Sequence, residues 1–233
     1  LASKSLRDCS LFQVKQSFVC FESTWRSCNT SLPDMDSSLQ QGKLLKDGGS
    51  ATVGLIDYSG KTVVLKRYNL KNWLHWLKRF WRPTRACHSW VAGHRLRVLG
   101  VSTPKPLAII EERMGPLRKR GFLLTEVAAG QDLVSVCQAP SITKLVAEQV
   151  ADVLEIFARE KITHGDFKAT NLLWGESLSL IDLDAVSWHK SEIKWAAAFE
   201  KDIKRLLRNW SQDSDQYQIM AEEIRSRLGY CPV

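Results

Sequence analysis

The segment of residues 164–171, with the sequence HGDFKATN, combines side-chain types that phosphoryl transfer requires. This reaction depends mainly on positioning: a carboxylate orients the attacking hydroxyl and accepts its proton, and oxygen ligands hold the magnesium ion that screens the phosphates. Asp166 and Asn171, five residues apart, can supply the base and a metal ligand. Lys168 projects toward the same space and can neutralise charge on the transferred group. Asp182, eleven positions after Asn171, follows a short apolar run and can reach the same metal ion.

The first half of the chain has the sequence pattern of β-structure. Residues 40–68 contain three apolar runs separated by the turn sequences DGGS and YSGK, which predicts a three-stranded antiparallel meander. A helix is predicted over 84–99, and Gly100 is a suitable residue just beyond its C-terminus. Two further strands are predicted at 107–111 and 122–127.

The second half is mostly helical in pattern. Its longest predicted helix begins after Pro140, with Ser141 as the expected N-cap. Two more helices are predicted at 194–210 and 216–228, and two short strands follow HGDFKATN at about 172–174 and 178–181. The apolar stripe of the long helix, interrupted only by Gln149, consists of Ile142, Leu145, Val146, Val150, Val153, Leu154 and Phe157.

This order of elements predicts an α+β fold with two lobes, a small β-rich N-lobe and a mostly helical C-lobe. We expect an N-terminal extension over 1–39, with a possible strand around 12–21, then the N-lobe over 40–128 and the C-lobe over 129–233. With 233 residues, 44% of them hydrophobic, the chain can bury a core and is too apolar to be disordered.

The positive charge of the chain is local. The formal net charge is +8, and residues 58–110 contain no acidic residue. The basic residues in that stretch are Lys61, Lys66, Arg67, Lys71, Lys78, Arg79, Arg82, Arg85, Arg95, Arg97 and Lys105. A local patch favours a particular anionic partner on one face, and no nucleic acid is expected because no recognised binding module surrounds it. The six cysteines form no CxxC pair and no secretory signal is evident, so a cytoplasmic location is expected.

The pattern HGDFKATNLLW…LIDLD resembles the catalytic and metal-binding loops of the protein-kinase-like superfamily. Over about residues 42–209 the chain is similar to the bacterial lipopolysaccharide core kinases of the Kdo and heptose kinase family. The resemblance implies ATP and Mg²⁺ as cofactors and a sugar hydroxyl of the inner core, on Kdo or heptose, as phosphate acceptor. It also implies work on a lipid-anchored glycolipid at the inner face of the inner membrane.

The resemblance assigns roles along the chain. Asp166 and Lys168 would be catalytic, and Asn171 and Asp182 would be metal ligands, while His164 would support the loop. The residues that would contact the nucleotide are Gly48, Gly49 and Ser50 over the phosphates, Lys66 on the α and β phosphates, and Glu126 and Val127 at the adenine. Asp202 would support the catalytic loop from a helix. Taken singly, several of these residues could be ordinary turn or surface positions, but the ordered set favours a kinase fold.

One departure from the kinase pattern leaves alternatives open. Protein kinases pair the lysine at the position of Lys66 with a helix-C glutamate. The corresponding helix at 84–99 contains no acid, so His88 or a backbone carbonyl would have to orient Lys66. A catalytically weak or inactive scaffold in envelope biogenesis is therefore one alternative. A kinase for protein or for soluble small molecules is another, although no Ala-Pro-Glu motif or long activation segment follows Asp182.

The segment 71–90 alternates tryptophan with cations, a pattern typical of a helix at a membrane interface. Its members are Lys71, Trp73, Trp76, Lys78, Arg79, Trp81, Arg82, Arg85 and Trp90. We expect contact with an anionic membrane surface or an anionic glycolipid through this segment. The plainer interpretation is that the tryptophans pack on the N-lobe and the cations are solvated.

Overall fold

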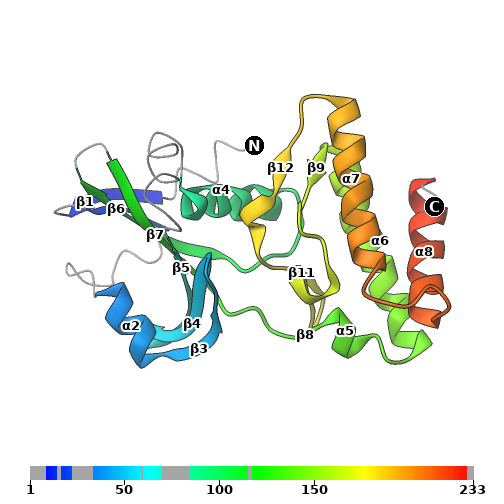
Figure 1. Ribbon diagram of the computed structural model, residues 1–233, viewed down its shortest axis with the longest axis horizontal. Coiled ribbons are helices and arrows are strands. Elements are labelled where there is room, and N and C mark those ends of the chain that lie inside the picture. The colour runs from blue at the N-terminus through cyan, green and yellow to red at the C-terminus, as the bar shows by residue number, and fades with distance from the viewer. Residues whose placement is uncertain are drawn as a thin grey trace. The chain divides into compact units, whose positions relative to one another are not determined.

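The computed structural model describes residues 9–14, 17–22, 34–58, 60–69, 84–114 and 117–229. The chain divides into two compact units, which are coloured by residue number in Figure 1. The N-terminal unit comprises Leu1–Val98 and Pro104–Val127. The C-terminal unit comprises Leu99–Thr103 and Ala128–Val233.

The N-terminal unit is built on one antiparallel seven-stranded sheet with the strand order β1-β2-β6-β7-β5-β4-β3. Its strands are β1 Cys9–Val14, β2 Ser17–Glu22, β3 Lys43–Asp47, β4 Ala51–Tyr58, β5 Lys61–Tyr68, β6 Pro106–Met114 and β7 Leu117–Thr125. The meander predicted within 40–68 is confirmed as β3, β4 and β5, because both turn sequences join adjacent antiparallel strands.

The outer part of this sheet differs from the sequence prediction. The possible strand around 12–21 is confirmed as β-structure but not as a single strand: the structure has two strands there, β1 and β2, and β2 pairs with β6. β6 and β7 form a longer hairpin than predicted, with backbone pairing as far as Met114 opposite Leu117. The charged sequence of this hairpin conceals it, because hydrogen bonding between backbones does not depend on side-chain polarity.

Helices cover both faces of the sheet. α2, Met35–Gln41, begins at the N-cap Asp34 and contributes Met35 and Leu39 to a core with Ile56, Leu65 and Phe122. α4, Arg85–Val98, packs on a second cluster that includes Trp90, Tyr68 and Ile109. Residues on opposite faces of one strand therefore belong to different cores, as the two-residue period of a strand requires.

The C-terminal unit is mostly helical, as predicted. Its helices are α5 Leu133–Val136, α6 Pro140–Arg159, α7 Glu192–Leu207 and α8 Asp215–Leu228. Its short strands are β8 Gln131–Asp132, β9 Ile162–Thr163, β10 Leu172–Trp174, β11 Leu178–Leu180 and β12 Ser187–Trp188. They form two small sheets, β11-β10-β8 and β12-β9, which hold the loops on either side of residues 164–171. Among the described residues, no helix is both long enough and apolar enough to cross a membrane.

The long helix α6 supports the HGDFKATN segment from its core side. Its Phe157 is buried, and its ring centroid lies 6.1 Å from that of Phe167, which is also buried. The expected N-cap Ser141 is wrong, because α6 starts at Pro140 after Ala139. Proline has no backbone N–H, and at this position it loses no hydrogen bond, since the first N–H groups of a helix have no partner within the helix. Leu145, expected in the apolar stripe, is 53% exposed.

We expect Phe157→Ala to lower the free energy of unfolding of the C-terminal unit by about 3–5 kcal/mol, because it leaves a cavity beneath Phe167. Leu145→Ala on the same helix is the matched control and should change it by less than about 0.5 kcal/mol. Urea denaturation followed by circular dichroism measures both. Equal losses in the two variants would contradict the orientation of α6.

Candidate active site

A buried carboxylate fixes the start of the loop that follows β9. Asp202 lies on α7 and is 1% exposed. Its Oδ2 accepts hydrogen bonds from the backbone N–H groups of His164, at 2.7 Å, and Gly165, at 2.9 Å. These contacts agree with the supporting role that the sequence resemblance implied for Asp202. Because two N–H donors converge on one carboxylate oxygen, helix α7 determines where the loop leaves the core.

His164 is a buried structural residue. Burial lowers the pKa of its ring, although the charge of Asp202 opposes this effect. Its Nε2 lies 3.1 Å from the carbonyl oxygen of Ile181, and a carbonyl can only accept a hydrogen bond. The proton of the neutral ring is therefore on Nε2. This bond ties the loop to the segment just before Asp182.

The backbone bends at Gly165, directly after His164. Its φ is +77°, a conformation that residues with a Cβ rarely adopt. A Cβ added there would lie 2.7 Å from the carbonyl oxygen of Ala185. The loop thus passes so close to the neighbouring backbone that a side chain has no room.

The carboxylate of Asp166 lies among three polar groups of the C-terminal unit. Oδ2 is 3.0 Å from Lys168 Nζ and accepts a hydrogen bond of 3.0 Å from Asn171 Nδ2. Oδ1 is 3.7 Å from Nε of Arg205, whose Nη1 donates to the carbonyl oxygen of Gly165. Partial burial raises the pKa of Asp166, but Lys168, Asn171 and Arg205 outweigh it and lower the pKa below its usual range. Asp166 is therefore a carboxylate at neutral pH, and it can accept a hydrogen bond from a hydroxyl.

Asp182 is brought next to Asn171 by the backbone. The N–H of Ile181 donates to the carbonyl oxygen of Asn171 at 2.9 Å. Asp182 itself has φ 60° and ψ 59°, a left-handed conformation that costs a residue with a Cβ about 1–2 kcal/mol. Strain of this kind is often retained at functional sites.

The donor set fits a magnesium ion. The amide nitrogen of Asn171 donates to the backbone and side-chain oxygens of Asp166, so its Oδ1 is the atom that can face a cation. Asp182 adds a carboxylate, and Mg²⁺ commonly takes one or two such protein oxygens together with phosphate and water. Within the described ranges, no group of three or more His, Cys, Asp and Glu side chains is arranged to hold a metal ion by itself.

The predicted nucleotide residues lie in the N-terminal unit. Gly48, Gly49 and Ser50 form the turn between β3 and β4, where the N–H of Gly48 donates to the carbonyl oxygen of Ala51 at 3.1 Å. Glu126 and Val127 follow the end of β7. The N–H of Glu126 is already bonded to the carbonyl oxygen of Lys105, at 3.0 Å, so that donor is used within the fold.

Lys66, on β5, has an aromatic neighbour. Its Nζ lies 5.1 Å from the ring centroid of Tyr68, and Arg85 Cζ lies 5.2 Å from the same centroid. Two cations near one tyrosine ring form cation–π contacts. The first turn of α4 has no acid, as the sequence indicated.

Sequence reasoning missed a buried acid that lies on the same face of the sheet as Tyr68. Glu111 on β6 is 1% exposed, and it accepts a hydrogen bond of 2.5 Å from Thr84 Oγ1. It shares a row of the sheet with Tyr68, because both pair with Gly121. Glu111 lies one residue beyond the acid-free stretch 58–110, and strand pairing, which local sequence does not show, brings it to the row of Tyr68. Arg205 was missed as well, although its position three residues after Asp202 places both on one side of α7.

The tryptophan-rich segment 71–90 is described from residue 84 onward. Residues 70–83 lie outside the described residues. Trp90 is described and is 3% exposed, packed with Ala86 and Leu123 in the core beneath α4. Its proposed place at a membrane interface is therefore wrong, because the indole ring is covered by protein. Arg85 donates from Nη1 to the carbonyl oxygen of Ser50 at 3.2 Å.

The arrangement of the C-terminal loop and the two-lobed α+β architecture define a protein-kinase-like fold. A solved structure of WaaP in complex with acyl carrier protein matches with a TM-score of 0.64 and 18% identity, covering 90% of this chain and 89% of that one. The sequence profile of the lipopolysaccharide kinase (Kdo/WaaP) family matches residues 40–223, and the chain belongs to this family. The predicted family, fold class and phosphotransferase activity with an alcohol group as acceptor are thereby confirmed.

Two curated relatives carry the same name. The 3-deoxy-D-manno-octulosonic acid kinase of Vibrio vulnificus (strain YJ016) is 26% identical over 211 residues, which are 86% of this chain and 88% of that protein. The 3-deoxy-D-manno-octulosonic acid kinase of Xylella fastidiosa (strain M23) is 26% identical over 179 residues, which are 71% of this chain and 68% of that protein.

Gly165→Ala should destabilise the C-terminal unit by more than the about 1–2 kcal/mol that a left-handed alanine costs, because the methyl group also meets the backbone at Ala185. Gly229→Ala is the matched control. Gly229 has φ +61°, but within the described part of the chain, its two sequence neighbours apart, no atom lies within 4 Å of an added Cβ. Thermal denaturation of both variants separates the backbone cost from the clash, and equal shifts would show that the close approach is unimportant.

Arg205→Gln should lower kcat by about 10²-fold and leave the KM for the nucleotide unchanged, because Asp166 loses its neighbour on Oδ1 and shifts its position. Arg208→Gln, an exposed arginine one turn further along the chain, is the control and should retain full activity. Steady-state kinetics measures both. A similar loss in the two variants would indicate a general effect on the helix.

Proposed function

We propose that this kinase transfers the γ-phosphate of ATP to a hydroxyl of Kdo in the inner core of lipopolysaccharide, with Mg²⁺ as cofactor. The observation that carries the proposal is the Asp166 carboxylate held between Lys168, Asn171 and Arg205. Kdo is preferred to heptose because the curated relatives described above are named for 3-deoxy-D-manno-octulosonic acid, which is Kdo. Membership of a kinase family supports ATP as the donor.

The residues of the C-terminal unit would share the work of the transfer. Asp166 would accept a hydrogen bond from the attacking hydroxyl, orient it and take its proton as the new O–P bond forms and the bond to ADP breaks. Lys168 would neutralise charge on the transferred group. Asn171 and Asp182 would hold Mg²⁺, which when bound screens the charge of the phosphates.

The residues of the N-terminal unit would bind the nucleotide. Lys66 would contact the α and β phosphates, and the Tyr68 ring would orient it in place of the missing helix-C glutamate. The backbone of Gly48, Gly49 and Ser50 would cover the phosphates. At the adenine, the carbonyl of Glu126 and the backbone of Val127 remain as contacts, because the N–H of Glu126 is engaged.

The acceptor would bring the enzyme to a membrane. Kdo of the inner core belongs to a lipid-anchored, acidic glycolipid, so we place the enzyme on the cytoplasmic, inner face of the inner membrane as a peripheral protein. The basic, tryptophan-containing sequence from Lys71 to Arg82 supports this placement by its composition.

Asp166→Ala should reduce transfer by about 10²–10⁴-fold, because removal of a positioned general base typically costs that much. ATP binding should remain. The assay uses γ-labelled ATP with two acceptors, a lipid A glycolipid that ends in Kdo and a core lipid that ends in heptose, with and without a chelator. Asp213→Ala, an exposed acid outside the loop, is the control.

The outcomes separate the candidate functions. Label on the Kdo lipid alone, lost in Asp166→Ala and with the chelator, supports the proposal. Label only on the heptose lipid would identify heptose, and not Kdo, as the acceptor sugar. Label only on peptides or free sugars would identify another kind of kinase. ATP binding without transfer to any acceptor would support the inactive scaffold and contradict the proposal.

A further inference from the structure

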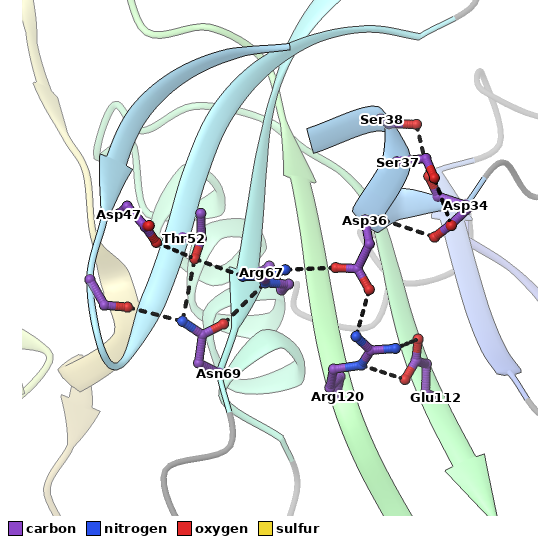
Figure 2. A network of polar contacts seen from close by, with 11 residues as sticks. Asp34, Asp36, Ser37, Ser38, Asp47, Thr52, Arg67, Asn69, Glu112 and Arg120 are labelled. Carbon is purple, nitrogen blue, oxygen red and sulfur yellow. Dashed lines mark hydrogen bonds and ion pairs between the residues drawn. The ribbon is translucent and has the colours of Figure 1, made fainter. Parts of the chain in front are cut away.

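A chain of polar contacts connects helix α2 to the turn between β3 and β4 (Figure 2). It starts at Asp36, in the first turn of α2, whose carboxylate bridges two arginines of the sheet. Oδ1 accepts a hydrogen bond of 2.8 Å from Nη1 of Arg67 on β5, and Oδ2 one of 2.5 Å from Nη1 of Arg120 on β7. Arg120 is itself paired with Glu112 on β6, at 2.8 and 3.0 Å. All four side chains are half-buried, so bulk water screens these pairs only in part.

From Arg67 the contacts continue to Asn69, just beyond the end of β5. Nε of Arg67 donates to Oδ1 of Asn69 at 3.1 Å, which fixes the orientation of the amide group. The amide nitrogen is thereby turned toward the turn, where it donates to the carbonyl oxygen of Gly48 at 2.9 Å (Figure 2). The backbone N–H of Asn69 donates to the carbonyl oxygen of Ser50 at 3.2 Å. One residue therefore holds two carbonyl groups of the turn.

A second branch of the network fixes the beginning of the turn. Nη2 of Arg67 donates to the hydroxyl of Thr52 at 3.1 Å, and this buried hydroxyl donates to Asp47 Oδ1 at 3.0 Å. Asp47 is the last residue of β3 and Thr52 lies near the start of β4. Arg67 is thus bonded to Thr52 on one strand beside the turn and, through the Thr52 hydroxyl, to Asp47 on the other.

Holding the carbonyl of Gly48 also determines where the next amide points. In a planar trans peptide the C=O and the following N–H point in opposite directions. The N–H of Gly49 is therefore directed away from Asn69. Gly49 is exposed, and apart from its two chain neighbours no described residue has an atom within 4 Å of a Cβ built on it. An amide of this kind, directed outward from a fixed turn, is a suitable donor to a phosphate oxygen.

We infer that Asn69, oriented by the Asp36–Arg67 ion pair, is a positioning residue for the phosphate-binding turn, and that α2 is thereby part of the nucleotide-binding apparatus. The inference rests on the proposed function, in which residues 48–50 cover the phosphates of ATP. It gives helix α2, which begins within the expected N-terminal extension, a role in binding the donor.

Asn69→Ala should weaken ATP binding by about 3–10-fold, which corresponds to the loss of one or two neutral hydrogen bonds. The affinity for adenosine should not change, because adenosine has no phosphate for the turn to contact. Asp36→Ala should act in the same direction, and the double variant should lose less than the product of the two single losses, because both act through Arg67. Calorimetric titration of the full chain with each ligand measures these effects.

Glu112→Gln is the matched control, because the Glu112 carboxylate belongs to the same network but joins it at Arg120, on the side of Asp36 away from Asn69. It should bind ATP and adenosine as the unaltered protein does. Equal weakening of ATP and adenosine in Asn69→Ala, or no weakening of either, would overturn the inference. If the unaltered protein itself binds no ATP, the proposed function fails, so the two failures are distinguishable.

Discussion

The candidate active site depends on the buried carboxylate of Asp202. The backbone N–H groups of His164 and Gly165 converge on its Oδ2, and leaving them unpaired in the core would cost about 1–3 kcal/mol each. The left-handed conformation of Gly165 and the position of Asp166 follow from that anchor. Arg205, on the same helix as Asp202, lies beside the Oδ1 atom of the Asp166 carboxylate. Helix α7, far away in the sequence, thus determines where Asp166, the proposed base, lies.

The two units surround their charged side chains with different groups. In the C-terminal unit, cations surround one carboxylate and keep it ionised, so it is ready to orient a hydroxyl. In the N-terminal unit, the tyrosine ring of Tyr68 lies near Lys66 and Arg85, in a region of sequence where acids are absent. An aromatic ring attracts a cation electrostatically, so it can hold a lysine in place without a carboxylate from the helix. The absence of a helix-C glutamate is therefore compatible with an active enzyme.

Much of the fold was accessible from local sequence patterns. The turn sequences DGGS and YSGK identified the meander of β3, β4 and β5, because turn chemistry and strand alternation are local properties. The predictions that failed concern residues whose structure depends on contacts with distant parts of the chain. The β1–β2 hairpin carries a weak local signal and is completed by pairing with β6. Trp90 was interpreted by its neighbours in sequence, whereas its burial depends on a sheet that lies elsewhere in the chain.

The sequence by itself determined the chemical identity of the candidate site, because Asp166, Lys168 and Asn171 lie in one short loop whose spacing limits how far apart they can be. It also indicated the family to which the chain belongs. Only the tertiary structure decided what holds these groups: Arg205 beside Asp166, Tyr68 near Lys66, and Asn69 on the turn after β3. These partners come from other helices and strands, and their proximity arises from packing and strand register, which no local spacing encodes.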